Sequence, residues 1–86
     1  MRKHIQNCLK EYFRFALIQT RDERRFSQEE MAHRLMMATR SYIDLEHGAS
    51  CCSAVTFMLY LLYVCPDPMA FLNELRHTLE KNHEVA

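Results

Sequence analysis

The sequence predicts an all-α fold in which residues 1–86 form one compact five-helix domain. A chain of 86 residues has room for a single small domain. Its 49% hydrophobic and 26% charged residues are the balance of a globular protein rather than a disordered one. One glycine and two prolines are too few for a β-sandwich or barrel, which needs a turn about every ten residues.

The first helix is expected over about residues 3–23, because apolar side chains recur there at intervals of three and four. The apolar face is widened by Phe15 and Ile18, which favours burial on more than one side. The stripe consists of Ile5, Leu9, Tyr12, Phe13, Ala16, Leu17 and Thr20.

Two short helices follow. The pattern Ser-x-x-Glu at Ser27 and Glu30 is a capping box, in which the serine hydroxyl accepts from the Glu30 amide and the Glu30 carboxylate returns to Ser27. The next helix is expected over about 39–47. It is expected to end at Gly48, the only glycine, because glycine readily adopts the left-handed conformation of the residue that terminates a helix.

Two further helices complete the count. Ser53 can cap a helix that runs to Tyr63, and Asp67 followed by Pro68 supplies an N-cap and a proline at the first helical position. The C-terminal helix is therefore expected over about 67–82. Its buried stripe would be Phe71, Leu72, Leu75 and Leu79.

Charge is balanced overall but not along the chain. Eleven basic and eleven acidic side chains give a formal net charge of zero, which excludes a uniformly basic nucleic-acid binder. Residues 1–40 carry nine Lys/Arg and five Asp/Glu, and residues 41–86 carry two and six. Only a local basic face in the N-terminal half could contact phosphate.

The sequence gives little support for an enzyme, a metal-binding protein or a membrane protein. We find no nucleophile–base set, carboxylate pair or glycine-rich phosphate loop at usable spacing, so we expect no enzyme, cofactor or small-molecule substrate. The cysteines and histidines lack metal-site spacing. Without a signal-peptide pattern or an apolar run of about 20 residues, we expect a cytoplasmic protein that does not enter a membrane.

The interval between the second and third helices is the informative one. These helices are joined through residues 36–38, which is too short a connection for an antiparallel pair, so they must cross steeply. That is the geometry of a helix-turn-helix, here over about 27–48, whose second helix enters the major groove of DNA.

The motifs around this interval resemble the helix-turn-helix domains of Cro and phage repressors, the XRE family. The matching residues, in ungapped register from about 17 to 64, are Ser27-Gln28-Glu29-Glu30-Met31-Ala32, Leu35, Tyr42, Leu45-Glu46-x-Gly48 and Ser53-x-x-Thr56-Phe57. The resemblance implies a lambda-repressor-like fold and a DNA-binding transcriptional regulator, with residues 39–47 as recognition helix. A homodimer is expected, because one module covers only about half a helical turn of groove.

The resemblance also assigns residue roles. It implies a structural ion pair between Arg21 and Glu46 that fixes the angle of the recognition helix. It places Gln28 at a phosphate. It implies base-edge contacts for Thr39, Arg40 and Asp44, and backbone contacts for Ser41 and His47.

Two departures from the family carry conformational expectations. Met36 stands where the family has glycine, which is tolerated if this residue avoids positive φ. Ala38 stands where the family has a Ser/Thr cap, and its loss costs about 1 kcal/mol unless Thr39 takes over. Apolar side chains for a dimer face are expected in the last two helices: Phe57, Tyr60, Leu61, Leu72 and Leu75.

Two alternatives remain open. A protein-interaction module that keeps this fold without binding DNA is favoured by the zero net charge, by Asp44 and by the apolar Ile43. A thiol or metal sensor would rest on Cys51, Cys52 and His47, if the nearby helix start lowered a thiol pKa.

Overall fold

The computed structural model describes residues 2–85, with side chains up to Lys81, and its described residues form five α-helices and no strand. This confirms the all-α, five-helix prediction. The helices are α1 (Arg2–Arg24), α2 (Gln28–Arg34), α3 (Thr39–Glu46), α4 (Ala54–Leu59), which continues as a π-helical turn, η1 (Tyr60–Val64), and α5 (Pro68–Val85).

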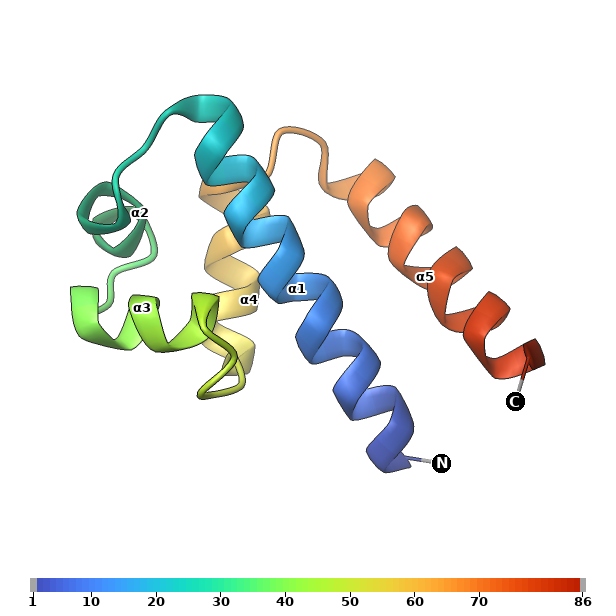
Figure 1. Cartoon of the computed structure of the whole chain (residues 1–86). Helices are drawn as coiled ribbons and strands as arrows, with labels where there is room; N and C mark the ends of the chain where they lie inside the picture. The colour runs from blue at the N-terminus through green and yellow to red at the C-terminus, as the bar shows by residue number, and fades with distance from the viewer. Residues whose placement is uncertain (1, 86) are drawn as a thin grey trace.

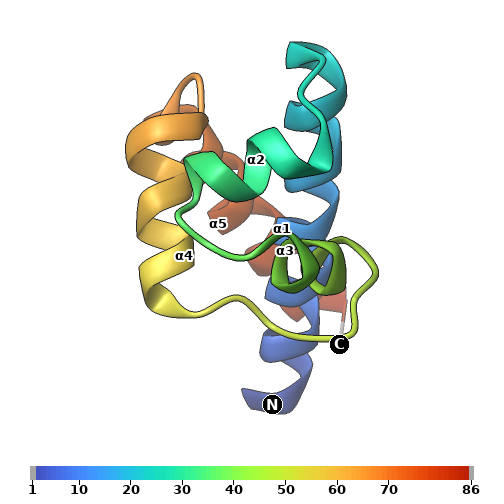
Figure 2. The same cartoon turned by 90° about the vertical axis from the view of Figure 1, so that its left-hand side faces the viewer.

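The long helix α1 forms the centre of the molecule (Figure 1). The short helices α2 and α3 lie on one side of it and α5 lies on the other, with α4 behind. The view in Figure 2 faces α2 and α3, which cross steeply, and places α4 along the flank of the pair. The fold therefore presents the two short helices together on one face.

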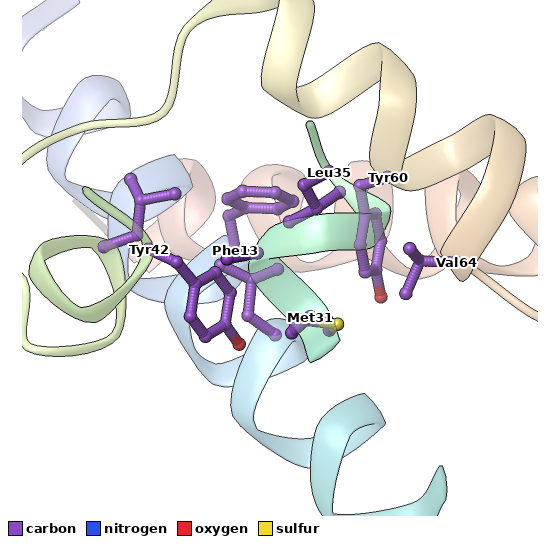
Figure 3. Packing of buried hydrophobic residues seen from close by; sticks show 9 residues of the cluster. Phe13, Met31, Leu35, Tyr42, Tyr60 and Val64 are labelled. Carbon is purple, nitrogen blue, oxygen red and sulfur yellow. The ribbon is translucent and has the colours of Figure 1, made fainter. Parts of the chain in front are cut away.

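The core lies where α1, α2, α3 and η1 meet (Figure 3). The Phe13 and Tyr60 rings meet edge to face at 5.2 Å between centroids, and the Tyr60 and Thr20 hydroxyls share a hydrogen bond of 3.0 Å. The fully or nearly buried apolar residues are Phe13, Leu17, Met31, Ala32, Leu35, Tyr42, Leu45, Tyr60 and Val64.

The outer helix α5 departs from its predicted stripe. Phe71 packs against the core, but Leu72 is exposed, and Leu75 and Leu79 are only half-buried. Helix α5 packs along α1, and through Phe71 it also meets the rings of Phe57 and Tyr60, which leaves the side that carries Leu72 open. Likewise Ile5 and Leu9 of the predicted α1 stripe stay partly exposed, because the first turns of α1 extend beyond α3 (Figure 1).

The predicted N-caps form. The Oγ of Ser27 accepts from the Glu30 amide at 3.1 Å, and the Oγ of Ser53 accepts from the Thr56 amide at 3.2 Å. The Oδ1 of Asp67 accepts from the Ala70 amide at 3.1 Å. Only half of the capping box is present, because the Glu30 carboxylate makes no return bond to Ser27 among the described contacts.

Helix ends differ slightly from the predicted ones. Helix α3 stops at Glu46 with His47 as its C-cap, and α5 continues to Val85 rather than about 82. The fourth helix ends in the π-helical turn, closed by a 2.8 Å bond from the Cys65 amide to the Tyr60 carbonyl. Cys65 has extended backbone (ψ 126°), as expected before a proline, so the helix must end there.

Three helices end in the same hydrogen-bonded motif, although the chain has one glycine. After α3, Gly48 (φ +75°) is followed by Ala49, whose amide bonds to the Asp44 carbonyl at 2.9 Å. Arg25 (φ +58°) and Met36 (φ +56°) hold the corresponding left-handed position after α1 and α2. The condition under which a residue other than glycine is readily tolerated at position 36, a negative φ, is therefore not met.

The Met36 conformation is set by backbone hydrogen bonds. Its amide donates to the His33 carbonyl at 3.1 Å, and the Met37 amide donates to the Ala32 carbonyl at 3.0 Å. These two bonds close the α2 end as a Schellman motif, which requires a left-handed residue at position 36. The following cap, Ala38, forms no side-chain cap bond, and Thr39 does not supply one.

We expect Met36→Gly to stabilise the protein by roughly 0.5–1 kcal/mol, because glycine removes the left-handed penalty of an L-residue but adds chain entropy to the unfolded state. The Met36 side chain is 73% exposed, so its removal loses little packing. The free energy of unfolding of Met36→Gly in urea should be compared with that of Met36→Ala. The alanine variant also loses the side chain but keeps the energetic penalty of a left-handed L-residue. Equal stability of the glycine and alanine variants would contradict the expectation.

Candidate nucleic-acid interface

Glu46 on α3 is buried, at 4% exposure, and its carboxylate is held by three side-chain donors. Arg21 of α1 binds it with two nitrogens, Nε to Oε2 at 2.6 Å and Nη2 to Oε1 at 3.2 Å. The Nε2 of Gln28 on α2 donates to Oε1 at 3.0 Å, and the Tyr42 hydroxyl donates to Oε2. The structure thus brings Arg21 and Glu46 together and adds two donors that the sequence did not indicate.

The network favours the charged forms of Glu46 and Arg21. Burial raises the pKa of Glu46, but hydrogen bonds from Arg21, Tyr42 and Gln28 outweigh burial and lower it. The hydrogen bond to Glu46 raises the pKa of Arg21, while burial and the same carboxylate raise the pKa of Tyr42. At neutral pH the carboxylate is therefore charged, and the phenol keeps its proton to donate.

Arg21 also ties the network to the chain between α1 and α2. Its Nη1 donates to the Phe26 carbonyl at 3.3 Å, one residue before the Ser27 cap. One guanidinium therefore fixes both the entry to α2 and the carboxylate of α3. This connection sets the position of α3 relative to α1 and α2.

The outward side of α3 carries the residues assigned to DNA. Arg40, Ser41 and His47 are exposed, and Thr39 and Asp44 are half-buried. The inward side is Tyr42, Leu45 and Glu46, all buried. All five predicted side chains are therefore at least partly accessible. Arg40 and Asp44 pair across one turn of α3, with Nε and Oδ1 at 3.9 Å.

Gln28 differs from its assigned role. Its side-chain nitrogen is committed to Glu46 and the residue is half-buried, so the amide faces the interior network. The first turn of α2 also carries Glu29 and Glu30, whose charges oppose phosphate. The structure therefore gives Gln28 a positioning role, and its phosphate contact stays a prediction.

Two arginines of the basic half were not singled out from the sequence, and one of them, Arg14, reaches the end of α3. Arg14 of α1 lies against Gly48 at the end of α3, with its Cδ 3.6 Å from where a glycine Cβ would be. Arg34 at the end of α2 stacks over the Phe26 ring at 4.2 Å from the centroid. The basic surplus of residues 1–40 was the available signal, but it could not place either side chain.

The sensor alternative has lost its chemical basis at Cys52. Burial, with a contribution from Cys51, raises the pKa of the Cys52 thiol, whereas the sensor hypothesis needs a lowered one. Among the described side chains, which do not include His83, no three His, Cys, Asp or Glu residues gather as metal ligands.

The predicted dimer face also needs correction. Tyr60 is 1% exposed and Phe57 and Leu61 pack against the core, so these side chains point inward. Helix α4 is turned so that a different set of residues faces outward.

Comparisons with protein families, curated proteins and solved structures give no match to this chain. Among the described residues, no helix combines the length and the apolar character that crossing a membrane requires. We therefore infer the function from the geometry of α2 and α3 and from the sequence motifs.

We expect Glu46→Gln to destabilise the protein by roughly 2–3 kcal/mol at neutral pH, because it leaves Arg21 without its buried counter-charge. The pKa of Glu46 is lowered from 4.5, so its contribution is complete above about pH 4.5 and is lost as the pH falls through the folded-state value. The stability gap between parent and variant should accordingly narrow in acid.

Denaturant unfolding between neutral and acidic pH measures this gap. Glu80→Gln is a suitable control, because Glu80 forms an exposed pair with Arg76. A gap for Glu46→Gln that stays constant or widens in acid would show that the ionised network does not stabilise the fold.

Proposed function

We propose that this protein is a sequence-specific, double-stranded-DNA-binding transcriptional regulator that inserts α3 into the major groove and acts as a homodimer. The observation that carries the proposal is the Glu46 network. It anchors the inward side of α3 to α1 and α2 while the opposite side remains exposed. A recognition helix needs this combination of fixed orientation and free side chains. The resemblance of the 27–57 motifs to Cro-type domains supports the same function.

In this proposal Arg40 is the principal base-reading residue. Its guanidinium can donate to O6 and N7 of guanine, a contact worth roughly 1–3 kcal/mol in discrimination. The competing exposed pair with Asp44 is worth only about 0.3–0.5 kcal/mol, so the base contact would displace it. Asp44, once released, can accept from a cytosine amino group, and Thr39 lies beside Arg40 at the start of α3.

Phosphate contacts would come from the margins of α3. Ser41 and His47 are exposed on it, and Arg14 of α1 lies beside Gly48 at its end. Arginines and hydroxyls are common phosphate ligands and position a helix without reading sequence. In this arrangement Gln28 contributes indirectly, by holding Glu46.

A second candidate is a protein-interaction module with the same fold. The observation that favours it is acidic character near the face: Glu29 and Glu30 open α2, and Asp44 neutralises Arg40. A protein partner with basic groups would fit these carboxylates better than DNA would. Binding of duplex DNA separates the two candidates.

We expect Arg40→Ala to weaken specific binding by roughly 1–3 kcal/mol and to relax the preference at one base position. Duplexes that bind the parent protein are first selected from a random pool at about 50 and about 200 mM salt. Two salt concentrations are used because phosphate contacts make the affinity fall as salt rises. The matched control is Arg76→Ala, because Arg76 is also highly exposed and also pairs with a carboxylate four residues later (81% against 88% side-chain exposure).

The expected result is a recovered motif whose sharpness decreases in Arg40→Ala and not in Arg76→Ala. Salt-sensitive binding without any motif would limit the function to non-specific DNA binding. No binding at the lower salt concentration would refute the proposal and favour the protein-interaction module.

A further inference from the structure

The outward side of the fourth helix is the most apolar exposed surface of the described chain. Residues 49–66 contain no Asp, Glu, Lys, Arg or His. Within this segment Tyr60 and Val64 are buried in the core, whereas four large side chains of α4 and η1 remain between 55% and 68% exposed. We call these four residues the α4 stripe: Val55, Met58, Leu62 and Tyr63.

The α4 stripe is continuous. Val55, Met58 and Leu62 are separated by three and four positions, which places them on one side of a helix. Tyr63 follows within the π-helical turn, beside Leu62. The four side chains expose on the order of 500 Å², in the upper range for the largest apolar patch of a monomeric protein. A patch of this size usually marks an interaction site.

We propose that the α4 stripe is the surface through which two copies of this chain pair around a two-fold axis. A second copy fits because the stripe has no charge that would need an opposite charge on the partner, and an uncharged apolar surface is complementary to itself. The roughly 500 Å² of the stripe is more than half of the about 800 Å² that each partner buries in a standard interface.

The position of α4 suits a dimer that binds DNA. In Figure 2, α2 and α3 lie nearest the viewer, with α3 seen almost end-on, and α4 lies along one flank. A two-fold axis parallel to the line of sight beside α4 therefore leaves the N-terminal ends of both α3 helices on the same face. A dimer of this kind that binds DNA needs its two recognition helices about one helical repeat, roughly 34 Å, apart. This last step rests on the proposed function, whereas the pairing itself does not.

Sedimentation equilibrium of the full chain without DNA tests the pairing. We expect the parent to form a concentration-dependent dimer. The double variant Met58→Glu, Leu62→Glu places like charges against each other across the axis and should weaken dimerisation by at least ~100-fold. The matched control is Phe15→Glu, because Phe15 on α1 is similarly exposed, at 65%, but lies outside the stripe.

Circular dichroism should show parental helix content for both variants, because all three replaced side chains are exposed. A parent that stays monomeric at its highest soluble concentration would overturn the inference. So would a double variant that dimerises like the parent, or a Phe15→Glu variant that loses dimerisation to the same extent.

The DNA selection distinguishes this inference from the proposed function. A dimer that depends on the stripe but selects no DNA would uphold the interface and refute the regulator. Specific binding by a strict monomer would refute the interface and the homodimer, and would uphold only sequence-specific DNA recognition by α3.

Discussion

A carboxylate removed from water must be surrounded by donors, and Glu46 obtains its donors from three different helices. Arg21, Gln28 and Tyr42 can reach it together only when α1, α2 and α3 have their observed positions. Loss of one donor would leave the charge of Glu46 only partly satisfied, which is costly in a buried site. The steep crossing of α2 and α3, and the exposed surface of α3 that follows from it, depend on this requirement.

Much of the helical frame could be predicted because its signals are local. Ser27, Ser53 and Asp67 each cap a helix through a bond to an amide three residues later, so a short stretch of sequence specifies the outcome. Gly48 is also a local signal, since a single glycine between two helical segments predicts the left-handed residue that ends a helix. The positive φ of Arg25 and Met36 has no such signal, because backbone bonds within each helix end impose it on residues that do not favour it.

Tertiary packing explains what the sequence could not predict about the candidate site. The apolar excess of the last two helices placed Tyr60 with the dimer face, but the edge-to-face contact with Phe13 and the bond to Thr20 hold it in the core. Gln28 was assigned outward by its place in the motif, whereas the unmet hydrogen-bonding capacity of Glu46 draws its amide inward. Arg14 reaches the end of α3 only through its contact with Gly48, which is distant from it in sequence.

The environments of the tyrosines give the molecule built-in optical probes. The chain has no tryptophan, so tyrosine emission is not masked by energy transfer to an indole. The Tyr42 hydroxyl bonds to a carboxylate, an acceptor that quenches phenol fluorescence, and this quenching depends on α3 being docked. Tyr63 instead faces solvent from η1. Tyr12 also meets a carboxylate, that of Glu74, so in a Tyr12→Phe background a rise in tyrosine emission reports detachment of the third helix without any introduced label.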